Sequence, residues 1–386
     1  MEIKCNSKSK LNDINCVYIL KDILKYIKKI RSYKILNYNT LLKRLSINPE
    51  DFKKMHIFVY LKNRYDFEID IDEKKFILMG KAIQDLDFFE HIELNEFEEF
   101  NLSYNSLTDI TKLKQLGLNQ LLILDLGYNS LKNIDVLAEI NFPFLKKLFL
   151  GNNQLDNINA LTKMNMKNLT ELNLECNYIT IIEPLKDVCF KKLKKLNLNI
   201  NEIYNIDELK NVNFKELKEL YLKNNNIVEI KQLDKTNFPQ LEVLDFEENK
   251  ISNINVLENV NFNEIKILIL RENRIYDINI FRSVKFTSLE NLDLSKNKIV
   301  NINGLKTDFA EELKKLNLSF IIIKGIEILK EIKFKNLEEL DLIRNDLNNE
   351  DKQIIEILNV WEASRQDMVV LRIILRSAVD WSTSTS

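Results

Sequence analysis

The sequence predicts an α/β solenoid, a horseshoe of stacked repeats with a parallel sheet on its concave side and helical caps at both ends. The first observation is a rhythm of asparagines, which recur every 24 residues from Asn105 to Asn297 and again at Asn345. The second is that apolar residues keep fixed offsets around each asparagine, so that residues 193–214 read LxxLxLxxNxIxxIxxLxxxxF. One unit cannot bury these side chains alone, whereas stacked neighbours bury them together.

Each part of the repeat predicts one element. The LxL pair alternates with polar residues, which indicates a short strand with one face turned inward. The asparagine turns the chain out of that strand, and its amide can satisfy backbone groups that the turn leaves unpaired. The IxxIxxL stretch returns along the convex side, and the phenylalanine packs behind the strands. Eleven units span residues 97–347, and a degenerate unit precedes them with Lys81 in place of the asparagine.

One unit departs from the rhythm, because Ile321 stands where an asparagine is due. Loss of that amide is expected to leave backbone groups unpaired, at a cost of roughly 1–3 kcal/mol. Residues 320–323 therefore indicate a local kink, a partner contact or simple decay of the repeat.

The N-terminal residues 1–75 have a different pattern. Apolar residues from Val17 to Ile30 recur at helical spacing, and Asn48-Pro49-Glu50-Asp51 is typical of a helix start. Residues 67–71 and 75–79 predict a hairpin, so the order resembles a winged-helix module. Residues 1–80 carry 17 basic and 10 acidic side chains, which is compatible with nucleic-acid binding. The simpler interpretation is a helical cap that covers the first repeat.

At the other end, residues 354–361 predict a capping helix with Ile354, Ile355, Leu358 and Trp361 facing inward. The apolar residues 369–375 are expected to form a second helix, and the Ser/Thr tail to be disordered. The predicted domains are thus an N-terminal cap at residues 1–75, a solenoid at 76–350 and a C-terminal segment at 351–386.

Composition and motifs argue against catalysis. The chain has no glycine-rich phosphate loop and no HExxH, CxxC or GxSxG motif, and its histidines, His56 and His91, lie outside the regular repeats. We therefore predict no catalytic residue, no cofactor and no metal site. A net charge of −2 implies no bulk attraction to nucleic acid or anionic membrane. Four scattered cysteines and the lack of a signal peptide or long apolar run predict a cytoplasmic protein, with the oligomeric state left open.

The repeat resembles that of leucine-rich-repeat proteins, and its NxIxxIxxL part is similar to the class found in the regulatory subunit of type-1 protein phosphatase and in bacterial internalins. The resemblance covers residues 97–347. It implies a scaffold that binds other proteins and no catalysis. Those families use 22-residue units, so the 24-residue unit and its phenylalanine are departures. Leucine-rich-repeat ubiquitin ligases of bacteria carry a catalytic cysteine after the repeats, whereas the last cysteine here, Cys189, lies within them.

Partner-binding residues are predicted on the concave face, at positions six, four and two before each asparagine and at the strand edge. One cluster joins aromatic side chains around Gly127 and Gly151, and a second joins apolar and charged side chains farther along. The predicted partner-binding residues are Tyr104, Tyr128, Phe149, Tyr221, Asp245, Glu247, Ile269, Arg271 and Asp293. Lysine and glutamate alternate at Lys147, Glu171, Lys195 and Glu219, which indicates cross-strand pairs that stabilise the sheet.

Three functional hypotheses follow. The first is an adaptor that holds a protein partner across the concave sheet. The second is a nucleic-acid-associated protein that uses the basic N-terminal module. The third is a non-catalytic subunit that recruits substrates to an enzyme complex.

Overall fold

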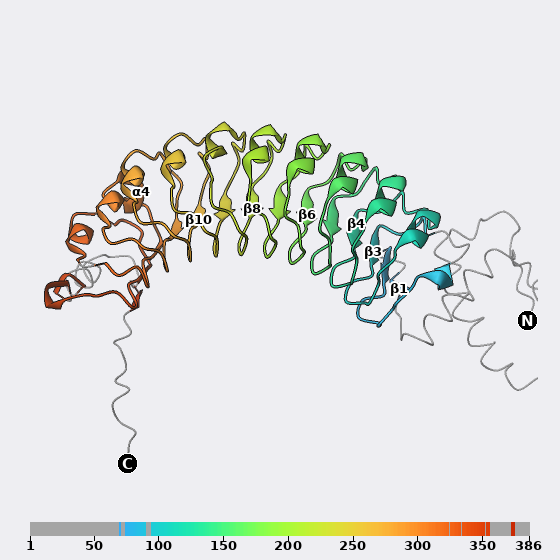
Figure 1. The fold of residues 1–386 in the computed structure, drawn as a ribbon, viewed down its shortest axis with the longest axis horizontal. Helices are drawn as coiled ribbons and strands as arrows, with labels where there is room; N and C mark the ends of the chain where they lie inside the picture. Colours follow the sequence, from blue (N-terminus) through green and yellow to red (C-terminus); the bar gives the residue numbers. More distant parts are fainter. Residues whose placement is uncertain are drawn as a thin grey trace, which may run out of the picture.

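The computed structural model describes residues 69–70, 74–89, 94–323, 325–332, 334–351, 353–355 and 372–374. These residues form a curved rod, with strands on the inner side of the arc and short helical turns on its outer side (Figure 1). The predicted horseshoe with a parallel concave sheet is thereby confirmed. The helical cap predicted in residues 1–75 lies outside the described residues apart from 69–70 and 74–75, and so do both histidines.

One sheet of fourteen strands runs the length of the rod, in the order of the sequence. The strands are β1 (Ile69–Asp70), β2 (Lys75–Ile77), β3 (Glu99–Asn101), β4 (Ile123–Asp125), β5 (Lys147–Phe149), β6 (Glu171–Asn173), β7 (Lys195–Asn197), β8 (Glu219–Tyr221), β9 (Val243–Asp245), β10 (Ile267–Ile269), β11 (Asn291–Asp293), β12 (Lys315–Asn317), β13 (Glu339–Asp341) and β14 (Arg372–Ile374). From β2 to β13 the strands are parallel, and each residue pairs with the one 24 positions away. The rhythm therefore fixes the register, because a slip of one residue would expose the buried leucines.

The convex side is built of 3-10 turns in place of longer helices. They are η1 (Asp87–Phe89), η2 (Thr111–Gln115), η3 (Asp135–Glu139), η4 (Asn159–Lys163), η5 (Glu183–Asp187), η6 (Asp207–Asn211), η7 (Leu233–Lys235), η8 (Asn255–Glu258), η9 (Asn279–Arg282), η10 (Asn303–Leu305) and η11 (Glu327–Lys330). A short α-helix, α4 (Asp308–Glu311), follows Thr307, whose hydroxyl accepts the Ala310 N–H. Behind the strands, phenylalanines such as Phe190, Phe214 and Phe238 are buried in the predicted spine.

The recurring asparagines, which we call the ladder asparagines, lie at aligned corners where the strands end. The amide of Asn201 donates to Leu198 O of its own repeat at 3.1 Å and to Leu174 O of the preceding repeat at 3.0 Å. Its Oδ1 accepts the Ile179 N–H at 3.1 Å. Each ladder asparagine thus joins two repeats, as predicted.

The residue before each corner has a left-handed backbone, a feature that the sequence did not predict. Eleven residues, none of them glycine, have φ between 50° and 59° at this position: Tyr104, Tyr128, Asn152, Cys176, Ile200, Asn224, Glu248, Glu272, Lys296, Phe320 and Arg344. A non-glycine residue adopts this conformation only when its surroundings enforce it. The ladder amide supplies that constraint in ten of the repeats.

At Ile321 the backbone departs from the repeat. Ile321 is buried, and Ile322 takes a second left-handed conformation with φ 60°. The Ile299 N–H, whose counterparts donate to a ladder asparagine, has no acceptor among the described residues. Asn345 restores the pattern in the next repeat by donating to Leu318 O at 2.8 Å.

The C-terminal end differs in part from the prediction. Residues 349–351 and 353–355 are helical, and Ile354 and Ile355 are buried as expected. The predicted second helix at residues 369–375 is wrong where the chain is described, because β14 pairs in parallel with β13. The reason is that β-branched residues favour strands and that β13 leaves an open sheet edge beside them. The Ser/Thr tail lies outside the described residues.

Candidate functional site

The concave face is lined by the first and third residue of each strand, because the central residue points into the core. The third residue is aspartate or asparagine in eight repeats, and its oxygen accepts the N–H two residues later. We call these eight the sheet row: Asn101, Asp125, Asn173, Asn197, Asp245, Asp293, Asn317 and Asp341. The row satisfies an amide that the parallel sheet leaves without a carbonyl partner.

Three predicted partner-binding residues, Phe149, Tyr221 and Ile269, interrupt the sheet row. In the described chain, the amides two residues after Phe149 and Ile269, those of Gly151 and Arg271, have no acceptor. The amide two residues after Tyr221, that of Lys223, does have an acceptor. It donates to Asn199 Oδ1 of the preceding repeat at 2.7 Å. None of these three side chains accepts the amide two residues later, as the Asp and Asn side chains of the sheet row do.

The first predicted cluster is assembled in part. The rings of Tyr104 and Tyr128 stack with 3.9 Å between centroids and 10° between planes, and both are about half exposed. Phe149 lies on β5, half-buried, and among the described residues its ring joins neither tyrosine. Gly151 leaves little room for a side chain, because a Cβ there would lie 3.0 Å from Asn173 Oδ1.

Tyr221 lies at the centre of the concave face. Its hydroxyl donates to Glu219 Oε2 at 2.9 Å, and the Lys195 ammonium lies 5.2 Å from its ring centroid. Burial, together with the bond to Glu219, raises the pKa of Tyr221 to about 12. The phenol is therefore a protonated donor at neutral pH.

In the second predicted cluster, two carboxylates flank an aliphatic residue. Ile269 pairs with Asp245 of β9 on one side and with Asp293 of β11 on the other. Burial raises the pKa of Asp245 to about 6, and it also raises the pKa of Asp293. A cation placed beside Ile269 would favour the ionised form of both groups.

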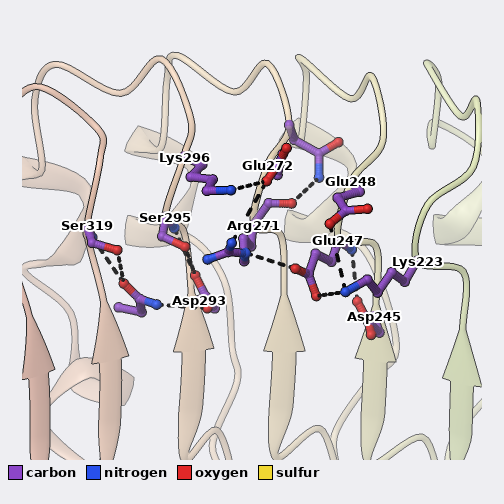
Figure 2. A network of polar contacts seen from close by, with 12 residues as sticks. Lys223, Asp245, Glu247, Glu248, Arg271, Glu272, Asp293, Ser295, Lys296 and Ser319 are labelled. Carbon is purple, nitrogen blue, oxygen red and sulfur yellow. Dashed lines mark hydrogen bonds and ion pairs between the residues drawn. The ribbon is translucent and has the colours of Figure 1, made fainter. Parts of the chain in front are cut away.

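Charged side chains form a continuous network above these strands, shown in Figure 2. Glu247 lies between two cations, with Arg271 Nε at 2.8 Å and Lys223 Nζ at 3.0 Å from its oxygens. Glu272 extends the network to Lys296 at 2.6 Å. Glu247 and Arg271 thus hold each other in place, in the way that charged side chains at the rim of an interface do.

The alternating lysine and glutamate row forms the predicted cross-strand pairs. Lys147 lies 2.9 Å from Glu171, and Lys195 lies 3.0 Å from Glu219. These pairs are solvated and contribute little each. They join neighbouring strands of the sheet, as predicted.

Sequence reasoning missed an exposed apolar column outside the concave face. Tyr204, Tyr276 and Val300, each the third residue after a ladder asparagine, are all more than half exposed. The sequence could have revealed this column, because residues at the same offset are polar in the first three repeats and aromatic or aliphatic at these three positions. Within the described ranges, no helix is long and apolar enough to cross a membrane, and no group of histidine, cysteine and acidic residues is placed to hold a metal ion.

Comparison with known families bears on this arrangement. Family models match in two places, described as "Leucine rich repeat" over residues 143–203 and "Leucine Rich repeats (2 copies)" over residues 215–259. The chain carries leucine-rich repeats. No curated protein matches its sequence.

Solved structures share the fold of this leucine-rich-repeat chain. An internalin, InlF of Listeria monocytogenes, is similar with a TM-score of 0.65 and 24% identity, over 79% of this chain and 83% of the internalin. The leucine-rich-repeat ectodomain of the Arabidopsis thaliana receptor kinase GASSHO1/SCHENGEN3 has a TM-score of 0.54 and 24% identity, over 68% of this chain. The match spans 32% of that ectodomain. The expected likeness to internalins is thus confirmed at the level of fold.

Proposed function

We propose that this leucine-rich-repeat chain is a non-catalytic scaffold that binds a protein partner across its concave face. The observation that carries the proposal is the replacement of the sheet row by Phe149, Tyr221 and Ile269. Asparagine in place of Phe149 or Ile269 would satisfy a backbone amide that has no acceptor among the described residues, so each apolar side chain forgoes a hydrogen bond worth about 1 kcal/mol. Large side chains that the fold does not need, on a polar face, are typical of interface anchors.

The charges near Ile269 indicate the chemistry of the partner. Two carboxylates with raised pKa values, Asp245 and Asp293, flank this residue, so a partner cation would be favoured there. Tyr104 and Tyr128 offer stacked aromatic surface at the other end. We expect the partner to present apolar and basic side chains together.

Related folds support a binding role. The plant receptor ectodomain of this fold was solved in complex with CASPARIAN STRIP INTEGRITY FACTOR 2. We extend from that protein only the class of function, which is binding of another macromolecule on a leucine-rich-repeat solenoid.

Affinity capture of the double variant Phe149→Asn/Tyr221→Asn tests the proposal. Both asparagines fit the sheet row, so thermal unfolding is expected to stay cooperative. Quantitative mass spectrometry should show the partners enriched by the wild-type chain reduced by about tenfold or more. Asn317→Ala, in the same row at the far end, is the matched control and should capture as the wild type does. Equal capture by a folded double variant would contradict a concave site.

We also propose a cytoplasmic location. Cys176 and Cys189 are free thiols, as expected in a reducing compartment. Fractionation of cells that carry the tagged chain tests this, and recovery in a secreted or membrane fraction would contradict it.

A further inference from the structure

A second surface lies on the exit segments, the residues between each ladder asparagine and the following helical turn. The first and third residue of each exit segment point outward, because the aliphatic residue between them is buried. Ile203, for example, is buried between exposed Glu202 and Tyr204. This alternation is that of an extended chain, so both outward residues lie on one face.

Hydrogen bonds join the exit segments of successive repeats. Lys250 N donates to Ile227 O at 2.9 Å, and Lys298 N donates to Ile275 O at 2.8 Å. Outward residues of neighbouring repeats are therefore adjacent, and they form a continuous surface along the rod.

In five successive repeats, the third residue of the exit segment forms a column in which four of five residues are apolar. We call this column the edge strip, and it consists of Tyr204, Val228, Ser252, Tyr276 and Val300. Its four apolar members are between 45% and 63% exposed. The repeat fold does not demand this, because the same position holds Thr108, Lys132 and Asp156 in the first three repeats. An exposed strip in which four of five residues are apolar, and which the repeat fold does not require, indicates an interface.

The edge strip has a two-fold pattern about Ser252. If a second strip runs antiparallel to the first, Tyr204 faces Val300 and Val228 faces Tyr276. Each aromatic ring then meets an aliphatic side chain, and the small Ser252 meets its own copy at the axis. Such self-complementarity is what a closed dimer of identical chains requires.

One pair of charges beside the strip follows the same symmetry. Glu202 and Lys298, both exposed, are the outward neighbours of Tyr204 and Val300, so the two-fold places opposite charges together. At the axis, Lys250 would lie beside the Lys250 of the second copy. Its ammonium donates to Asn226 Oδ1 at 2.7 Å, so it is directed along its own chain. The like charges of Glu229 and Asp277 lie at the rim of the strip, where water screens them.

We propose that the edge strip binds a second copy of this chain in an antiparallel two-fold dimer centred on Ser252. The proposal is independent of the concave face, which stays open in the dimer. The strip spans only five repeats, so the contact belongs to the small class of interfaces, and the dimer is in equilibrium with the monomer.

Sedimentation velocity over a concentration series of the full chain tests the proposal. Wild type should shift from monomer towards dimer as concentration rises. Tyr276→Asp should remove the shift, since it places a charge opposite Val228. Lys132→Glu alters the same repeat position outside the strip, and it should associate as the wild type does.

A charge exchange tests the register. Glu202→Lys alone and Lys298→Glu alone should each weaken association by about tenfold, because each creates like-charged pairs. A mixture of these two variants should associate like the wild type, since both contacts become opposite in sign, and so should the double variant. A wild type that stays monomeric at every concentration overturns the proposal. A mixture no better than either variant overturns the antiparallel register.

Discussion

Individual side chains in the sheet row satisfy backbone amides and also set the charge of the concave face. An aspartate and an asparagine serve equally as acceptors for the amide two residues later, as Asp245 and Asn317 show. Only the aspartate carries a charge, and that charge is buried at Asp245. The fold alone therefore gives no reason for aspartate in place of asparagine at position 245.

The variant Asp245→Asn is expected to raise stability at neutral pH. The folded pKa of about 6 exceeds the ordinary value of 3.8, so the folded state holds its proton to higher pH and loses stability as pH rises from about 4 through 6. The ionised carboxylate therefore costs about 3 kcal/mol near pH 7.5, and asparagine avoids that cost.

Urea unfolding at two pH values measures the effect of this substitution. We expect the variant to be more stable than the wild type near pH 7.5 and about equal to it near pH 4. An advantage of the same size at both pH values would contradict a buried charge as the cause.

At the scale of elements, the ladder asparagine bonds to backbone groups at the end of a strand. These groups have no backbone partner in the sheet or in the following 3-10 turn. Asn225 accepts the Ile203 N–H at 3.0 Å and donates to Leu198 O and Leu222 O. Without the Asn225 side chain, Leu198 O would still accept from Asn201 and Leu222 O from Asn249. The Ile203 N–H would have no other acceptor among the described residues.

Asn225→Ala is therefore expected to cost about 3 kcal/mol, most of it from the orphaned Ile203 amide. Denaturant unfolding measures the loss, with the exposed Asn211→Ala as a control that should cost below about 0.5 kcal/mol. A loss for Asn225→Ala as small as that of the control would show that water replaces the amide.

The elements differ in how far the sequence predicted them. The places and the register of strands such as β7 and β8 were predicted, because the LxL pair and the period together fix which residues are buried and which residues pair. The left-handed residues before the ladder asparagines were not predicted, since the position holds types as different as Ile200 and Glu248. The strand β14 was predicted as helix, because a short apolar run without a repeat gives no period to separate the two.

The residue columns of the concave face were predicted, but the hydrogen bonds along them were not. The sequence places Phe149, Tyr221 and Ile269 on a polar face, where the structure shows them half-buried. That they displace a row of amide-accepting side chains emerged only from the hydrogen bonds, because an isolated Asp or Asn in the sequence does not reveal which amide it accepts.

At the scale of the whole molecule, each repeat contacts only its neighbours, so stability is close to a sum over repeats. Removal of residues 201–224 deletes one period and joins Ile200 to Asn225, which keeps a left-handed residue before a ladder asparagine. We expect this chain to fold and to unfold cooperatively in circular dichroism.

Removal of residues 213–224, half a period, puts the later asparagines out of phase and should abolish that transition. Equal behaviour of the two deletions would contradict a solenoid whose register depends on the period.

The central claim is that the three residues that interrupt the sheet row serve binding and not folding. Its most direct test is the free energy of unfolding of the triple variant Phe149→Asn/Tyr221→Asn/Ile269→Asn. The new amides supply acceptors for Gly151 and Arg271, which have none in the described chain. We predict a stability equal to that of the wild type or up to about 2 kcal/mol higher. A loss of more than about 2 kcal/mol would show that these side chains hold the fold together, and would contradict the account.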